Sequence, residues 1–310
     1  MTTTVEGRIA ARRRERRLAQ FVDRSAEMAL FGQVLDTDTL PVMVVTAESG
    51  MGKTSLMTRM VHECALRKLL NAELEWGSLE VLDYMLVMRK LRDALGVEHF
   101  IAFTDLINYY TDDGYQPRLD ININLQGSSI QVAGGAQISG STIGDIAGVV
   151  LRDNNFSVQR SDIAVPDEVR RERLTERFLQ GLTDLSAEQK VVLFFNATEK
   201  MSDLTHQWLW EQLLKPVVDG ALPNVRAVLL GQRPPPEDDD LLEFLARVAL
   251  KPLDTDDINA YIKNRAEGKI VISDEMRREL AEMLIGATDG QPARVAAAVD
   301  KYLVKRGVSL

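Results

Sequence analysis

The stretch V-V-T-A-E-S-G-M-G-K-T-S, from Val44 to Ser55, decides how the rest of the chain is interpreted. It ends in Gly-Lys-Thr after a short apolar run, which is typical of a phosphate-binding loop between a strand and a helix. The usual pattern, G-x-x-x-x-G-K-[ST], begins with a glycine, where this chain has Ala47. Because an apolar run precedes the loop and helical spacing follows it, the context favours a nucleotide site over a helix start that merely carries glycines.

The chemistry of such a loop depends on consecutive backbone N–H groups placed ahead of a helix N-terminus. Gly50 and Gly52 allow the backbone to turn and to approach phosphates without a Cβ in the way. Lys53 is expected to reach the β- and γ-phosphates, and the Thr54 hydroxyl is expected to coordinate Mg²⁺. Alanine penalises positive φ, so Ala47 predicts phosphate binding that is weakened or reshaped but kept.

A second candidate segment is V-V-L-F-F-N-A-T-E-K at residues 191–200, which contains the most hydrophobic predicted strand and should be central in a sheet. Phosphate-loop enzymes place an acidic residue at the end of such a strand to hold magnesium. Here that position is Asn196, whose uncharged amide should lower the affinity for Mg²⁺. Glu199 could orient attacking water or take over part of the metal role. Both residues could instead only cap the next helix.

A third candidate is Arg233, which follows the buried strand predicted in V-R-A-V-L-L-G-Q-R. An arginine there could sense the γ-phosphate or stabilise its transferring charge. It could equally pair with the acidic run E-D-D-D at residues 237–240.

The composition excludes several classes of protein. The chain has 310 residues, of which 45% are hydrophobic, and no apolar run approaches the roughly 18 to 20 residues that span a bilayer. The N-terminus has charges where a signal peptide needs an apolar core. A single cysteine, Cys64, rules out an internal disulfide framework, and the three histidines lack ligand spacing. We therefore expect a cytoplasmic protein without a membrane partner.

The charge distribution bears on nucleic acid as a partner. The formal net charge of −9 argues against a chain built to coat nucleic acid. The first twenty residues depart from this trend, with six arginines against Glu6 and Glu15. Such an arm could contact phosphates or an anionic partner, or it could be a solvated, partly helical tail.

The alternation of apolar runs and helical spacing predicts an α/β fold, with a three-layer P-loop NTPase core around a parallel sheet. Period-two runs punctuated by glycine predict a β insertion, which could be a small β-solenoid or a mobile hairpin. After Leu241 we expect helices and no further strand. The predicted segments are a basic arm and helix at 1–35, the first half of the core at 36–117, the insertion at 118–160, the second half of the core at 161–245 and a helical lid at 246–310.

With these motifs in order, the chain resembles the STAND class of P-loop ATPases, which is close to the NACHT and AAA+ proteins. The match covers most of the chain outside the insertion. It consists of F-V-D-R-S-A-E-M-A-L-F (Phe21–Phe31), the Walker A position (Glu48, Ser49, Gly50, Met51, Gly52, Lys53, Thr54 and Ser55), the Walker B position (L-F-F-N-A-T-E-K), the turn G-Q-R (Gly231–Arg233) and a lid with the G-x-P element Gly290-Gln291-Pro292.

This resemblance implies ATP or ADP with Mg²⁺ as the bound cofactors. It places Phe21 and Arg24 in the segment that lies against the adenine, and Pro292 in the lid near the nucleotide. It gives Glu199 and Arg233 catalytic roles, with Thr54 and Asn196 at the metal. Family members typically act as nucleotide-gated switches, often in bacterial conflict and defence.

The departures at Ala47 and Asn196 suggest slow or absent hydrolysis. Sensor or effector parts would be separate proteins or lie beyond this sequence, and a homo-oligomer is compatible with the resemblance. One alternative is a non-enzymatic scaffold built on a dead ATPase core. Another is a DNA-associated AAA+ ATPase that uses the arginine-rich arm.

Overall fold

The computed structural model describes residues 12, 14–19, 21–74, 83–111, 149–152, 155–158, 166–235 and 239–308. The chain divides into two compact units, one formed by Met1–His99 with Leu179–Leu310 and the other by Phe100–Phe178. The first unit contains the sheet, the loop at Val44–Ser55 and the C-terminal helices.

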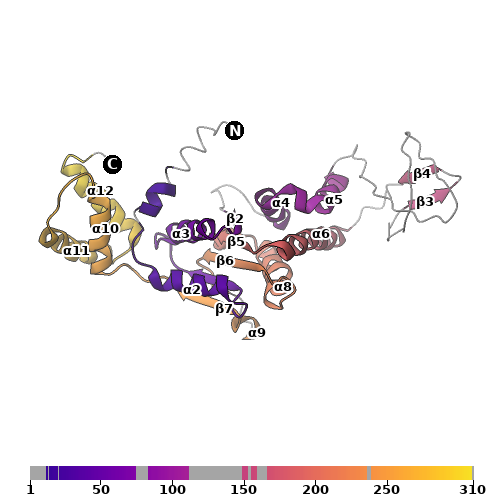
Figure 1. Ribbon diagram of the computed structural model, residues 1–310, viewed down its shortest axis with the longest axis horizontal. Coiled ribbons are helices and arrows are strands. Elements are labelled where there is room, and N and C mark those ends of the chain that lie inside the picture. Colours follow the sequence, from indigo (N-terminus) through magenta and orange to yellow (C-terminus); the bar gives the residue numbers. More distant parts are fainter. Residues whose placement is uncertain are drawn as a thin grey trace. The chain divides into compact units, whose positions relative to one another are not determined.

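A five-stranded parallel sheet forms the centre of the first unit, which confirms the predicted α/β fold (Figure 1). The strands are β1 (Val42–Thr46), β2 (Leu70–Leu74), β5 (Val191–Asn196), β6 (Val225–Gly231) and β7 (Leu245–Ala249), in the order β2-β5-β6-β1-β7. Every residue of β5 and β6 is buried, as expected for parallel strands that are covered on both faces.

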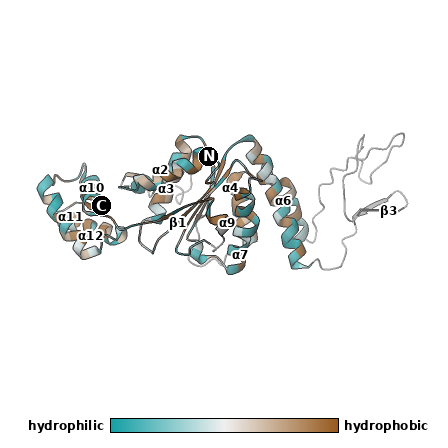
Figure 2. Cartoon of the chain, turned by 90° about the horizontal axis from the view of Figure 1, so that it is seen from below, coloured by the Kyte–Doolittle hydropathy of each residue, from teal (hydrophilic) through white to brown (hydrophobic). Residues whose placement is uncertain are grey.

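Helices cover both faces of this sheet. One hydrophobic core joins the sheet to α2 (Ser25–Asp36) and α3 (Lys53–Leu66), and these two helices lie on the opposite side of the strands from α7 (Asp203–Trp208) in Figure 2. The remaining elements of the core are α4 (Tyr84–Leu95), the C-terminal part of α6 (Asp167–Glu188), the 3₁₀ turn η2 (Thr198–Lys200), the π-helical turn η3 (Leu209–Leu214), α8 (Lys215–Val218) and α9 (Asp239–Leu242).

In the segment predicted to be a lid, and called the lid below, three helices pack around a hydrophobic core of their own. They are α10 (Thr255–Ala266), α11 (Asp274–Thr288) and α12 (Pro292–Lys305). Ile258, Val295 and Val299 are fully buried between them. A capping box at Asp254 and Asp257 fixes the start of α10.

The second unit contains η1 in part (Val97–Phe100), α5 (Ile101–Thr111) and the N-terminal part of α6. The rings of Phe100 and Phe178 stack with centroids 5.2 Å apart, and Phe103 meets Phe178 edge-on at 5.5 Å. In the predicted insertion, β3 (Val149–Arg152) and β4 (Asn155–Val158) form an antiparallel pair. The rest of residues 118–160 lies outside the described residues, so the solenoid and hairpin interpretations both stay predictions.

Strand β7 shows that the expectation of no strand after Leu241 is wrong. It pairs in parallel with β1, from Val42↔Leu245 to Thr46↔Ala249, so the sheet extends past the predicted boundary at residue 245. The physical reason is its edge position. Only Leu245 and Ala246 of this strand are buried. Its sequence therefore lacks a clear alternation of apolar and polar residues and cannot be told apart from the helical spacing before it.

The helix predicted within residues 1–35 is interrupted in the structure. Residues 14–19 are helical, and α2 begins only at Ser25. Asp23 and Arg24 between them have φ angles of 56° and 69°. Two consecutive left-handed residues cannot continue a right-handed helix, so the chain changes direction immediately before α2.

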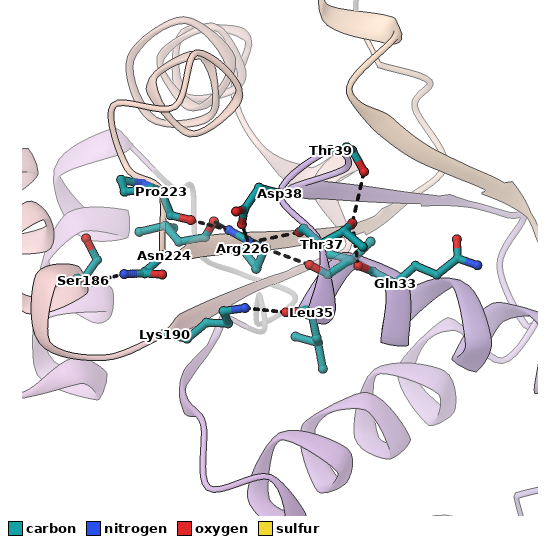
Figure 3. Close-up of polar contacts among 12 residues, drawn as sticks. Gln33, Leu35, Thr37, Asp38, Thr39, Ser186, Lys190, Pro223, Asn224 and Arg226 are labelled. Carbon is teal, nitrogen blue, oxygen red and sulfur yellow. Dashed lines mark hydrogen bonds and ion pairs between the residues drawn. The ribbon is translucent and has the colours of Figure 1, made fainter.

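A buried arginine fixes the other end of α2 (Figure 3). Arg226, on β6, is 1% exposed. Its Nε donates to the carbonyl of Val34 at 2.8 Å, and its Nη2 donates to the carbonyl of Thr37 at 3.1 Å and to the carboxylate of Asp38. Lys190 donates to the carbonyl of Leu35 at 2.5 Å. Together these cations satisfy carbonyls that the end of a helix leaves unpaired.

Candidate functional site

The candidate site lies at the carboxyl ends of β1, β5 and β6. The chain leaves β1 through α3 and returns at β2, on the far edge of the sheet, whereas β7 lies on the other side of β1. A reversal of this kind opens a crevice at the carboxyl ends of parallel strands, where α/β proteins bind ligands. A cavity of about 620 Å³ lies there, a size suited to a small-molecule ligand.

Most of the residues predicted for the site line this cavity. They are Phe21, Arg24, Ser49, Gly50, Met51, Gly52, Lys53, Thr54, Ser55, Asn196, Glu199 and Pro292. Glu48 and Arg233 are not among the lining residues. The further lining residues, which sequence reasoning missed, are Arg17, Val22, Ala197, Lys200, Gln232, Leu253, Tyr261, Ala293 and Ala296.

The backbone of the loop has the conformation that its glycines allow. Gly50 and Gly52 have φ angles of +84° and +88°, and α3 begins at the next residue, Lys53. Ala47 is not among the described residues with positive φ, and its N–H donates to the carbonyl of Gly231 at 3.0 Å. The predicted conformational penalty at Ala47 is therefore wrong, because its backbone does not enter the region that disfavours alanine.

The side chain of Lys53 turns back into the loop and is 9% exposed as a residue. Its ammonium donates to the carbonyls of Ala47 and Glu48, at 2.6 and 2.9 Å. Burial lowers the pKa of Lys53 from its usual value, and the charge of Glu199 opposes that shift. Glu48 thus takes part through its carbonyl, as an acceptor for the lysine.

Thr54 and Asn196 meet at the wall of the cavity. The amide nitrogen of Asn196 donates to the hydroxyl of Thr54 at 3.3 Å. Glu199 accepts a hydrogen bond of 3.2 Å from the backbone N–H of Gln232, which holds its carboxylate beside the end of β6. The helix-cap alternative is wrong for both residues, since Ala197 occupies the N-cap of η2 and Ser202 caps α7.

The close approach of η2 to β6 depends on a glycine. A Cβ on Gly231 would lie 2.0 Å from Oγ1 of Thr198 and 3.2 Å from Oε2 of Glu199. Ala197 begins η2 with a φ of 56°, an uncommon conformation for alanine. The sequence offered no clear signal for either feature, because both arise from the contact between two elements.

Arg233 lies away from the cavity wall, in an ion pair with Asp203 at 3.1 Å. Its charge also contributes to lowering the pKa of His206, after burial, which is the larger cause. The run at 237–240 lies outside the described side chains, so a pairing of Arg233 with that run is not tested.

The lid borders one side of the cavity and donates two hydrogen bonds to backbone carbonyls of the loop. The N–H of Ala293 donates to the carbonyl of Gly50 at 3.0 Å, and Nε2 of Gln291 donates to the carbonyl of Ser49 at 3.0 Å. Pro292, between them, lies 3.9 Å from the position of a Cβ on Gly52. The first turn of α12 is therefore seated on the loop.

The segment ahead of α2 forms another wall. Arg24 is 5% exposed, donates to the carbonyl of Lys251 at 2.8 Å and pairs with Glu27 at 3.3 Å. Phe21 packs against the core of the sheet, whereas Val22 packs against the core of the lid. This short segment thus borders the cavity between the sheet and the lid.

These residues fit a nucleotide better than they fit a metal ion alone. The cavity combines a glycine loop, a buried lysine and a helix N-terminus, which together favour phosphate. Among the described residues, no group of three or more His, Cys, Asp or Glu side chains could hold a metal ion. Mg²⁺ could still be shared with phosphates, since it commonly keeps waters and few protein ligands.

A parallel sheet with a glycine loop between its first strand and a helix, and with a lysine turned into that loop, is the arrangement of a P-loop NTPase fold. No protein-family model matches the sequence, and no curated relative matches it.

Similar solved structures include three proteins with low sequence identity. A STAND protein with a tetratricopeptide repeat sensor from Pyrococcus horikoshii is 13% identical, with a TM-score of 0.45 over 88% of this chain and 28% of its own. Cdc6p from Pyrobaculum aerophilum is 11% identical, with a TM-score of 0.49 over 93% of this chain and 65% of its own. The Drosophila ORC bound to DNA is 13% identical, with a TM-score of 0.45 over 92% of this chain and 57% of its own.

The chain thus spans less than two thirds of each of these three proteins. None of the described helices combines the length and the hydropathy that a bilayer crossing requires.

Proposed function

We propose that this chain binds ATP or ADP as a STAND-like switch, with weak or absent hydrolysis, in bacterial signalling or conflict. The observation that carries the proposal is the buried Lys53 within a glycine loop on which the lid is seated. Separate sensor or effector proteins would be its partners, and the lid would report the bound nucleotide to them.

Different residues of the cavity would contact different parts of the nucleotide. The backbone N–H groups from Gly50 onward and the ammonium of Lys53 would hold the β- and γ-phosphates. Thr54 would hold Mg²⁺, and Phe21 and Pro292 would border the adenine. Bound ATP would supply a γ-phosphoryl group for transfer to water. Glu199, held on the N–H of Gln232, would orient that water.

Weak hydrolysis follows from the chemistry of Asn196. An amide that donates to Thr54 brings no negative charge to the metal, so the protein contributes little to neutralising it. Arg233, paired with Asp203 outside the cavity lining, would have to leave that carboxylate before it could act on a phosphate.

The direct test is isothermal titration of the purified chain with ATP and with ADP, in the presence and absence of Mg²⁺. We expect binding by the wild type and a loss of at least tenfold in Lys53→Ala, since a charged hydrogen-bond donor contributes about 1.5 to 3 kcal/mol. Lys251→Ala is the matched control, because that side chain is exposed and does not line the cavity. Unchanged affinity in Lys53→Ala would contradict the proposal. No binding by the wild type would favour the scaffold alternative.

A further inference from the structure

Residues 14–19 of the arginine-rich arm, which form the short indigo helix nearest the N-terminus in Figure 1, make two ion pairs with other parts of the first unit. Nη1 of Arg14 pairs with the carboxylate of Glu73 at 3.2 Å, and Nη2 of Arg16 pairs with that of Asp300 at 3.5 Å. Glu73 lies near the carboxyl end of β2, and Asp300 lies on α12 in the lid. The arm therefore connects the edge of the sheet to the lid, and two of its charges are used within the chain.

The lid end of this connection is well anchored. Asp300 also accepts a hydrogen bond of 2.7 Å from Nε of Arg265, which is 3% exposed. One carboxylate thus joins the buried arginine of the lid to the arginine of the arm. Surface ion pairs are individually weak, but residues 14–19 make two of them, and the pair at Asp300 is joined to a buried arginine, so together they favour one position of this short helix.

Arg17 directly follows these two attached arginines in the sequence and lines the cavity. It is three residues after Arg14, so both side chains are on the same face of the arm helix. That face meets the carboxyl edge of the sheet, where Asn196 and Glu199 also line the cavity. Phe21, which follows the arm in the sequence, also lines the cavity.

The charges around the cavity suit a polyphosphate. Its charged lining residues are Arg17, Arg24, Lys53 and Lys200, with Glu199 as the one carboxylate among the described lining residues. Arg24 donates to Lys251 and Glu27, and Lys53 donates to the carbonyls of its own loop. A guanidinium binds phosphate in a bidentate manner, which makes Arg17 the most suitable further donor.

We propose that Arg17 contacts the phosphates of the bound nucleotide and that the arm is a strap, held by Arg14 and Arg16, that places it there. This assignment rests on the proposed nucleotide binding. In this proposal the arginines of the arm help to bind the nucleotide held by the same chain. It also makes nucleotide affinity sensitive to salt, because the ion pairs of the strap are exposed.

The test compares ATP, ADP and adenosine with the full chain, by isothermal titration or by displacement of bound ADP. In Arg17→Gln we expect the affinity for ATP and ADP to fall roughly tenfold, with adenosine unchanged. Arg17→Lys should restore part of the loss, because it keeps the charge but not the bidentate geometry. Arg12→Gln is the matched control, since Arg12 is exposed on the same arm and does not line the cavity.

The outcomes separate this inference from the proposed function. Equal losses for all three ligands in Arg17→Gln would show a structural role only, and no loss would show no contact; either result overturns the inference. If the wild type binds ATP and Arg17→Gln binds it equally well, nucleotide binding stands and the strap fails. If the wild type binds no nucleotide, the proposed function itself fails.

Discussion

The backbone N–H of Ala293 donates a hydrogen bond of 3.0 Å to the carbonyl of Gly50. This bond joins the first turn of the lid helix α12 to the glycine loop between β1 and α3. Because both partners are main-chain atoms, only a change of Ala293 to proline, which has no N–H, would remove it directly. The adjacent contact, from Gln291 to the carbonyl of Ser49, is accessible to mutation.

Removal of that side-chain contact should loosen the lid. In Gln291→Ala we expect amide exchange in the first turn of α12 to become about fivefold faster, since one hydrogen bond contributes roughly 1 kcal/mol to local stability. Hydrogen exchange read by mass spectrometry measures this. Lys301→Ala, an exposed change on the same helix, should leave the rate unchanged. Equal rates in Gln291→Ala and the wild type would mean that the contact does not hold the lid.

Gly290 should be sensitive to a single methyl group. Its φ is +67°, and a Cβ would lie 2.3 Å from the carbonyl oxygen of Leu253. A contact this short is a steric clash, which only a movement of the backbone could relieve. Gly268 has a similar φ of +70° with nothing within 4 Å. We expect Gly268→Ala to cost about 1 kcal/mol of unfolding free energy and Gly290→Ala at least about 2 kcal/mol. Urea unfolding of both variants measures the difference, and equal costs would contradict the steric argument.

Arg226 should be the most costly polar side chain to remove. Arg226→Met loses the donors to Val34, Thr37 and Asp38, so the carbonyls of Val34 and Thr37 lose these partners at the end of α2. We expect a loss of about 3 kcal/mol or more in unfolding free energy. Lys190→Met, which removes one hydrogen bond to the same helix end, should cost about 1 kcal/mol. If urea unfolding gives the same loss for both variants, the network is not the source of the stability.

His206 should make the fold less stable at mildly acidic pH. Burial and the charge of Arg233 lower its pKa from the usual 6.5, while Asp203 opposes the shift, and Nε2 accepts a hydrogen bond of 3.1 Å from Trp210. A histidine with a lowered pKa binds its proton more readily in the unfolded chain than in the folded one. The stability that it contributes is therefore fully present above pH 6.5 and is lost as the pH falls from 6.5 to the lower pKa of the folded state.

The measurement is the unfolding free energy between pH 7.5 and 5.5, for the wild type and for His206→Gln. We expect the wild type to lose more stability over this window than the variant does. His99, whose side chain is 32% exposed, serves as the control position, with His99→Gln as the matched variant. Parallel curves for the wild type and His206→Gln would exclude His206 as the titrating group.

Much of the site could be predicted because its signals are local. The glycines, Lys53 and Thr54 lie within one short stretch of sequence, and Asn196 ends a strand whose hydrophobicity makes it central. Strand order then brings these segments to one edge of the sheet. Local signals of this kind are sufficient to predict the position of the cavity from the amino-acid sequence alone.

The remaining features depend on contacts between distant segments. Arg17 and Tyr261 line the cavity because the arm and the lid pack there, and no spacing in the sequence indicates it. Arg233 follows a buried strand as expected, yet Asp203 on a neighbouring helix pairs with it. Ala47 was expected to be strained because the glycine of the usual pattern was assumed to need positive φ, whereas here its backbone does not adopt it.

The hydrogen bonds from Lys53 to the carbonyls of Ala47 and Glu48 bear on how tightly a ligand could be held. They tie the two ends of the loop to each other through the chain's own side chain, so the curvature of the loop does not rely on a ligand to impose it. For a nucleotide bound as proposed here, little of the interaction free energy would be consumed in ordering the backbone. The affinity of this chain is then set by preorganisation of the loop, in addition to the charges around it.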